Sequence, residues 1–78
     1  MKLEIISPEK FLFNGDADAI TLPGAGGVFS IMDKHVPMFS ILKSGTIQVK
    51  KTDSEVSFDI KDGVVEVKNN VLVICVNE

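Results

Sequence analysis

The chain has 78 residues, 45% of them hydrophobic, and a formal net charge of −3. This length predicts one domain, residues 1–78, with a thin core, because a domain this small buries only about 60% of its unfolded surface. The acidic balance argues against a nucleic-acid partner and against an anionic membrane surface, since both are bound by basic faces.

Cysteine content and hydropathy indicate the cellular compartment and the relation of the chain to a membrane. The single cysteine, Cys75, cannot form an intramolecular disulfide, which favours a reducing compartment. Neither the opening residues MKLEIISPEK nor any later run is apolar for long enough to predict a signal peptide or a membrane span. We therefore expect a soluble domain with no direct membrane insertion.

Alternation of apolar and polar residues predicts strands along most of the chain. It is visible in KLEIIS (2–7), TIQVKK (46–51), EVSFDIK (55–61) and VVEVK (64–68). The last run, VLVICV (71–76), is apolar on both faces and predicts a central strand. No window shows helical periodicity, so the chain is expected to be all-β.

Turn signals divide these runs at the spacing of a β-sandwich or barrel. Four dipeptides tolerate positive φ, namely Asn14-Gly15, Ser44-Gly45, Asp62-Gly63 and Asn69-Asn70, and Thr52 to Ser54 forms a polar tip. The expected fold is a two-sheet antiparallel β-sandwich of about ten short strands. The residues expected to face its core are Leu3, Ile5, Phe13, Ile20, Leu22, Ile31, Leu42, Ile47, Val49, Val56, Phe58, Ile60, Val65, Val67, Val73 and Cys75. Cys75 is thus expected to be a buried, inert small hydrophobe.

The segment PGAGGVFSIMDKHVP (23–37) raises the possibility of chemistry, because three glycines precede the only histidine, His35. A phosphate-binding loop would require Lys-Ser/Thr and a following helix, and both are missing. A zinc site would need more than one histidine and one cysteine, and the acidic pattern around Gly15 is too short for a calcium loop. His35 has no evident catalytic companion in the sequence. We expect no catalytic residue, no cofactor and no metal.

The same segment reads more easily as a contact surface. Val28, Phe29 and Met32 have no evident sheet to cover them, and Met38 and Phe39 follow closely. Phe and Met are enriched at interface cores, and exposed apolar patches on small domains usually mark a partner. This pattern favours a protein-binding surface over a ligand pocket.

The ordered motifs resemble the epsilon subunit of the rotary proton-translocating ATP synthase (delta in mitochondria). The run LPGAGGVFSIMDKHVPMFSILKSGTI (22–47) matches its signature at Pro23, Gly24, Gly27, Ile31, His35, Pro37, Leu42 and Gly45. The start, with a Ser-Pro-Glu-Lys turn at 7–10, and the end, DGVVEVKNNVLVICV (62–76), match as well. Two departures concern the loop: Ser30 replaces a glycine, and Asp33-Lys34 replaces a usual Pro-Gly.

The resemblance implies a ten-stranded sandwich in the central stalk, which turns with the rotor and couples proton flow to ATP synthesis without bond chemistry. Its partners would be the gamma subunit and the ring of membrane c subunits. The complex would lie peripherally on the cytoplasmic side of a bacterial inner membrane. Most members continue into inhibitory C-terminal helices, which are missing from these 78 residues. Neither inhibition nor ATP binding is therefore expected.

Site residues follow from the resemblance and from the exposed apolar pattern together. The tip expected to rest on the c-ring comprises Gly24, Gly26, Gly27, Val28, Phe29, Ser30, Asp33, Lys34 and His35. The residues expected to face gamma are Ser7, Met38, Phe39 and Thr46. His35 is open between a structural role and a contact role. The alternatives to a rotor subunit are a small stand-alone interaction or ligand-binding sandwich and an adaptor that adds a strand at a sheet edge.

Overall fold

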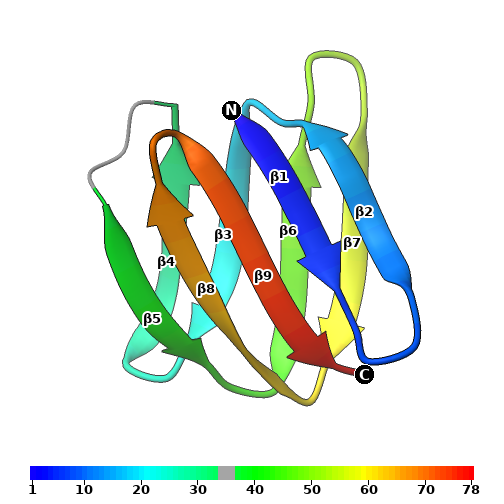
Figure 1. The fold of residues 1–78 in the computed structure, drawn as a ribbon, viewed down its shortest axis with the longest axis vertical. Helices are drawn as coiled ribbons and strands as arrows, with labels where there is room; N and C mark the ends of the chain where they lie inside the picture. Colours follow the sequence, from blue (N-terminus) through cyan, green and yellow to red (C-terminus); the bar gives the residue numbers. More distant parts are fainter. Residues whose placement is uncertain (34–36) are drawn as a thin grey trace.

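The computed structural model describes residues 1–33 and 37–78, and all of their regular structure is β (Figure 1). The strands of this part are β1 (Lys2–Ile6), β2 (Phe11–Asp16), β3 (Ala19–Gly24), β4 (Gly27–Met32), β5 (Met38–Leu42), β6 (Gly45–Lys50), β7 (Glu55–Ile60), β8 (Asp62–Lys68) and β9 (Val71–Asn77). The expected all-β fold is confirmed, with nine strands in the described residues where about ten were expected.

One hydrogen-bonded path, β2-β1-β9-β8-β5-β3-β6-β7, curls into two layers, with β4 added beside β3. The front layer holds β2, β1, β9, β8 and β5, and the back layer holds β4, β3, β6 and β7 (Figure 1). A single register pair, Gly24 opposite Leu42, joins the layers between β3 and β5. The sandwich is therefore one sheet folded over at that corner.

The expectation of purely antiparallel sheets is wrong at one place. Strands β1 and β9 pair in parallel, from Lys2 opposite Val71 to Ile6 opposite Cys75. A parallel pair needs a long connection, and almost the whole chain separates these two strands. The first and last strands thus lie side by side at the centre of the front layer.

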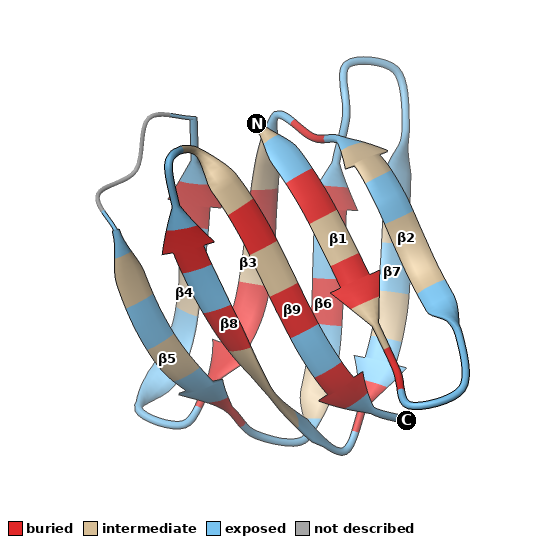
Figure 2. Ribbon diagram, viewed as in Figure 1, coloured by how far each residue is buried: buried red, intermediate tan, exposed pale blue. Residues whose placement is uncertain are grey.

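The core lies between the layers, and Figure 2 shows it as alternating buried positions along the strands. The side chains that are almost completely buried are Leu3, Ile5, Ile20, Leu22, Ile31, Leu42, Ile47, Val49, Val65, Val67, Leu72 and Ile74. Most of the expected core is confirmed. At one edge Phe13 of β2 and Phe58 of β7 are half-buried and meet edge to face, with ring centroids 6.4 Å apart. This pair closes the core on the side away from the β3–β5 corner.

Strand β9 faces the opposite way from its expected orientation. Leu72, Ile74 and Val76 are buried, whereas Val73 is half-buried and Cys75 is exposed. The register on β8 explains this orientation, because the inward Val65 and Val67 lie opposite Ile74 and Leu72. A strand that is apolar on both faces gives no sign of which set points inward. The expectation that Cys75 is a buried hydrophobe is therefore wrong.

The turn predictions have mixed outcomes. Asn69 and Asn70 join β8 to β9 with φ of 53° and 60°, as expected for a primed two-residue turn. Thr52 to Ser54 lie in the connection between β6 and β7, also as expected. Asn14-Gly15 is not a turn: both residues lie within β2, opposite Glu4 and Leu3 of β1. Strand pairing therefore overrides the local preference of the Asn-Gly dipeptide.

Candidate interaction surfaces

The glycine segment is a β-hairpin. Strand β3 ends at Gly24, Ala25 and Gly26 make the turn, and β4 begins at Gly27, which has φ of +133°. Only glycine adopts such a φ without strain. The glycines therefore set a tight reversal of the chain, and no helix follows to present its amides to an anion.

The outward residues of β4 form a narrow exposed stripe on the back layer, which we call the β4 stripe: Val28, Ser30 and Met32. Val28 is 72% exposed and Met32 is 64% exposed. Ser30 shares a hydrogen bond of 3.0 Å with the Thr21 hydroxyl of β3. Phe29 was expected to be exposed beside Val28, but it is half-buried and packs against the core. Alternation along the strand explains the difference, because neighbouring residues point to opposite faces.

The tip expected to meet the c-ring does not form as one cluster. Gly24, Gly26 and Gly27 lie at one end of β4, and Asp33 lies beyond its other end. A six-residue strand separates these groups by roughly 17–20 Å. Lys34 and His35 lie outside the described residues.

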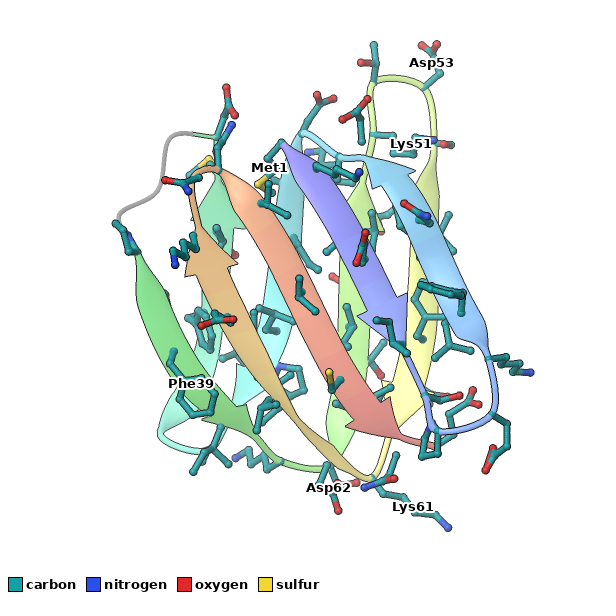
Figure 3. All side chains as sticks on the ribbon, in the orientation of Figure 1. Met1, Phe39, Lys51, Asp53, Lys61 and Asp62 are labelled. Atoms are coloured by element: carbon teal, nitrogen blue, oxygen red, sulfur yellow. The ribbon has the colours of Figure 1, made fainter. Side chains whose placement is uncertain are left out.

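Asp33 is fixed at its own end of the sandwich. Its Oδ1 accepts a hydrogen bond of 2.6 Å from Asn70 Nδ2. The same oxygen lies 3.6 Å from the ammonium group of Met1, which Figure 3 labels near the end of the front layer. The strand that leaves the glycine turn is therefore tied, at its far end, to the β8–β9 turn and to the start of β1.

The residues expected to face gamma lie apart from one another. Ser7 is only 5% exposed, and its hydroxyl donates to the Lys10 carbonyl at 3.2 Å. Met38 is half-buried against the core. Thr46 is exposed on β6 in the back layer and donates to Asp59 Oδ1 at 2.8 Å. Phe39, 64% exposed, projects from β5 in the front layer (Figure 3).

The structure reveals a second apolar surface that the sequence patterns did not single out. Strand register aligns one outward residue from each of the five front strands in a row across the layer. Ile41 lies opposite Val64, Val64 opposite Cys75, Cys75 opposite Ile6, and Ile6 opposite Phe11. We call these five residues the front row. A register shift between Ile5 and Ile6 brings Phe11 into this alignment. Ile41 is 59% exposed and Phe11 is 64% exposed.

Two shallow hollows lie in the front layer, and Cys75 borders both. One, of about 290 Å³, is lined by Ile6, Ser7, Pro8, Cys75, Val76 and Asn77. The other, of about 360 Å³, is lined by Ile41, Leu42, Asp62, Gly63, Val64, Cys75 and Asn77. Both volumes are at the lower end of the range for small-molecule pockets. Their shared position along the front row makes them suited to receive protruding side chains of a partner.

The described residues contain few groupings of side chains that could bind a metal ion or catalyse a reaction. Within residues 1–33 and 37–78 no three His, Cys, Asp or Glu side chains are grouped closely enough to hold a metal ion. A further hollow, between the start of β3 and the β6–β7 connection, is lined by Asp16, Ala17, Asp18, Lys51, Thr52, Asp53 and Ser54. There the Thr52 hydroxyl already donates to Asp18 Oδ2 at 3.1 Å. The exposed apolar surfaces are thus the most distinctive functional features of this part of the chain.

The family model for the ATP synthase delta/epsilon chain, beta-sandwich domain, matches residues 1–78. The ATP synthase epsilon chain of Chlorobium limicola is 41% identical over 70 residues, which cover 88% of this chain and 80% of that protein. That of Chlorobaculum tepidum is 34% identical over 77 residues, which cover 97% and 88%.

Other epsilon chains are longer than the matched region. The Sulfurovum epsilon chain is 43% identical over 68 residues, and the match covers 86% of this chain but only 53% of that protein. Among solved structures, the cryo-EM structure of the Tetrahymena thermophila mitochondrial ATP synthase, central stalk/c-ring, contains a similar chain. Its TM-score is 0.88 and its identity 26%, with coverage of 100% of this chain and 63% of that one. A Euglena gracilis ATP synthase chain shares the fold, with a TM-score of 0.90 at 20% identity.

Proposed function

Because the chain belongs to the ATP synthase delta/epsilon family of β-sandwich domains, we propose that it acts as a central-stalk subunit linking gamma to the c-ring. ATP synthase epsilon chains are non-catalytic subunits of a membrane-associated complex. In the proposed role the domain turns with the rotor and transmits torque, so that proton flow remains coupled to ATP synthesis. Its folded surface performs this task by contact alone.

One observation carries the proposal: the domain exposes two apolar surfaces on opposite outer faces. The β4 stripe belongs to the back layer, and the front row belongs to the front layer. Exposed apolar clusters on a small soluble domain usually mark partner sites. Two of them, facing away from each other, suit a subunit that bridges two neighbours.

We assign the β4 stripe to the c-ring and the front layer to gamma. Val28 and Ser30 of the β4 stripe were already expected from the sequence to face the c-ring. In this proposal the role of the other described hairpin residues is to shape the hairpin that carries the stripe: Gly24, Gly26, Gly27 and Phe29. Phe39 lies in the front layer beside the front row, two residues before Ile41 on β5. Ser7 and Met38, with little exposed surface, would support these contacts from within, and Thr46 would lie at the back-layer periphery.

The proposed location is peripheral, on the cytoplasmic side of a bacterial inner membrane. Within the described residues no helix has the length and apolar character to cross a bilayer. The proposal concerns residues 1–78 alone and assigns them no inhibition of ATP hydrolysis. A stand-alone interaction or ligand-binding sandwich is the alternative that the test must exclude.

The test is co-expression of the tagged chain with the gamma subunit of the same organism, followed by affinity capture. We expect gamma to co-elute with the chain at high salt. Solubilised synthase that contains Val28→Lys should lose c subunits more readily than the unaltered complex and still retain gamma. If gamma never co-elutes, the chain is not a stalk subunit and the stand-alone reading takes its place.

A further inference from the structure

Strand register fixes the order of residues along the front row. Its five residues, Ile41, Val64, Cys75, Ile6 and Phe11, come from five adjacent strands and run across them. Adjacent strands lie about 4.8 Å apart, so the row is roughly 19 Å long. A partner element that follows the row must therefore cross the strands and present side chains at close to that spacing.

We propose that the front row is the docking site for one α-helix of a partner, whose apolar stripe is flanked by basic side chains. This inference rests on the proposed function, which gives the front layer a rotor partner, and it specifies the element that binds. Side chains on one face of a helix recur about every 5.4 Å, one turn at a time. Over the length of the row the helix departs from the strand spacing by only about 2 Å.

An extended partner strand fits the row less well. Its same-face side chains recur about every 6.6–6.8 Å, so two steps already place it roughly 4 Å out of phase with the row. A helix of about 13 residues spans the whole row. The hollows that Cys75 borders would receive successive side chains of the helix's apolar stripe, since Cys75 is smaller than Val64 and Ile6, its two neighbours along the row.

Charge around the row favours a basic helix. In the adjacent row of register pairs Glu66 lies opposite Val73, and Val73 lies opposite Glu4. On the other side of the front row Asp62 lies opposite Asn77, whose Nδ2 donates to Asp62 Oδ1 at 2.7 Å. Three carboxylates therefore border the row. Among basic groups, Lys43 follows the end of β5, Lys10 lies between Glu9 and Phe11, and Lys61 precedes Asp62. Lys2 and Lys68 lie one row farther away.

The test uses synthetic peptides of about 14 residues held helical by a side-chain cross-link, because short helices are marginal in water. The first carries leucines along one face with lysines on both flanks. The second replaces those lysines by glutamates. The third has the composition of the first with its leucines scattered around the helix. Binding is measured by fluorescence anisotropy, and Cys75, the only cysteine in the chain, reports the position through its rate of alkylation by N-ethylmaleimide.

The lysine-flanked peptide should bind at least about tenfold more tightly than either of the others, and added salt should narrow that difference. It should also slow alkylation of Cys75 by at least about fivefold. Equal affinity for the lysine and glutamate peptides would overturn the inference, and so would unchanged alkylation of Cys75.

A matched pair of variants locates the binding. Ile41→Lys changes a front-row residue that is 59% exposed, and Val28→Lys changes a β4 residue that is 72% exposed. Because both side chains project from strands into solvent, both variants should melt close to the unaltered protein; Ile41→Thr replaces the first if it does not. Ile41→Lys should weaken peptide binding by at least about tenfold and Val28→Lys should leave it unchanged. Equal losses would overturn the inference.

These results are separable from the proposed function. Capture of gamma tests whether the chain is a stalk subunit, and the peptides test what the front row binds. If gamma co-elutes but the peptides bind elsewhere or not at all, the helix inference fails and the stalk proposal stands. If gamma fails to co-elute but the peptide binds with the expected pattern, the stalk proposal fails and the helix inference stands.

Discussion

The ring of Phe29 lies where Gly24 would carry a side chain. A Cβ placed on Gly24 would lie 2.7 Å from Phe29 Cε1 and 2.6 Å from the carbonyl oxygen of Gly27. Such distances are too short for a real carbon contact, so the aromatic ring and the hairpin backbone both depend on this glycine. Because Gly24 has no side chain, the Phe29 ring has room to pack against the core, and the alternate residues of β4 form the exposed stripe.

Gly24→Ala should therefore destabilise the domain. We expect the free energy of unfolding to fall by about 1–3 kcal/mol, because the added methyl group overpacks a closed site. Gly26→Ala is the control, since a Cβ there meets nothing within 4 Å. Urea denaturation of the two variants measures the difference. Similar losses for both would show that Phe29 and the hairpin backbone can move aside.

Phe29→Ser tests whether this residue is part of the core or part of a contact surface. Since Phe29 packs against the core, the substitution should lower the free energy of unfolding by about 2 kcal/mol. Val28→Ser, at the neighbouring and exposed position, should change it by less than about 0.5 kcal/mol. Thermal melts give the comparison directly. A Phe29→Ser protein as stable as the unaltered one would return Phe29 to the exposed surface that the sequence suggested.

Sequence patterns predicted the fold wherever one face of a strand is polar. In β8 the alternation of Val65 and Val67 with Glu66 and Lys68 determines which face is buried, and the Asn69-Asn70 turn fixes the next pairing. In β9 the pattern fails, because VLVICV can bury either set at similar cost. The choice depends on β8 and β1, which lie beside β9 only after folding.

The surfaces were harder to predict than the fold for a related reason. The front row exists only through four strand pairings, and one of them, Ile6 with Cys75, joins residues at opposite ends of the chain. No local window contains that information. The described residues of the tip predicted from residues 23–37 lie apart, because a strand at its centre carries Gly27 and Asp33 to opposite ends of the sandwich.

Cys75 should behave as an accessible thiol in the native protein. It is exposed, so alkylation by a maleimide should proceed under native conditions at a rate close to that in urea. Cys75→Ser should change the free energy of unfolding by less than about 0.5 kcal/mol, as for other exposed positions. Mass spectrometry of the timed reaction measures the rate. Labelling that requires unfolding would show that β9 buries Cys75, as its sequence alone suggests.

The β8–β9 turn should discriminate sharply between replacement of Asn69 by alanine and by glycine. Asn69 has φ of 53°, where Asn and Gly are tolerated and other residues pay about 1 kcal/mol or more. Asn69→Ala should therefore lower the free energy of unfolding by about 1 kcal/mol, a fall of several degrees in Tm for a domain of this size. Asn69→Gly should be nearly neutral.

Asp53→Ala, in the exposed β6–β7 connection, has no positive φ to lose and should be nearly neutral. Asn70 is left unchanged throughout, because its side chain also donates to Asp33 and would confuse the backbone effect. If Asn69→Ala and Asn69→Gly melted together, the turn would not hold its left-handed conformation. The register that exposes Cys75 would then depend on strand packing alone.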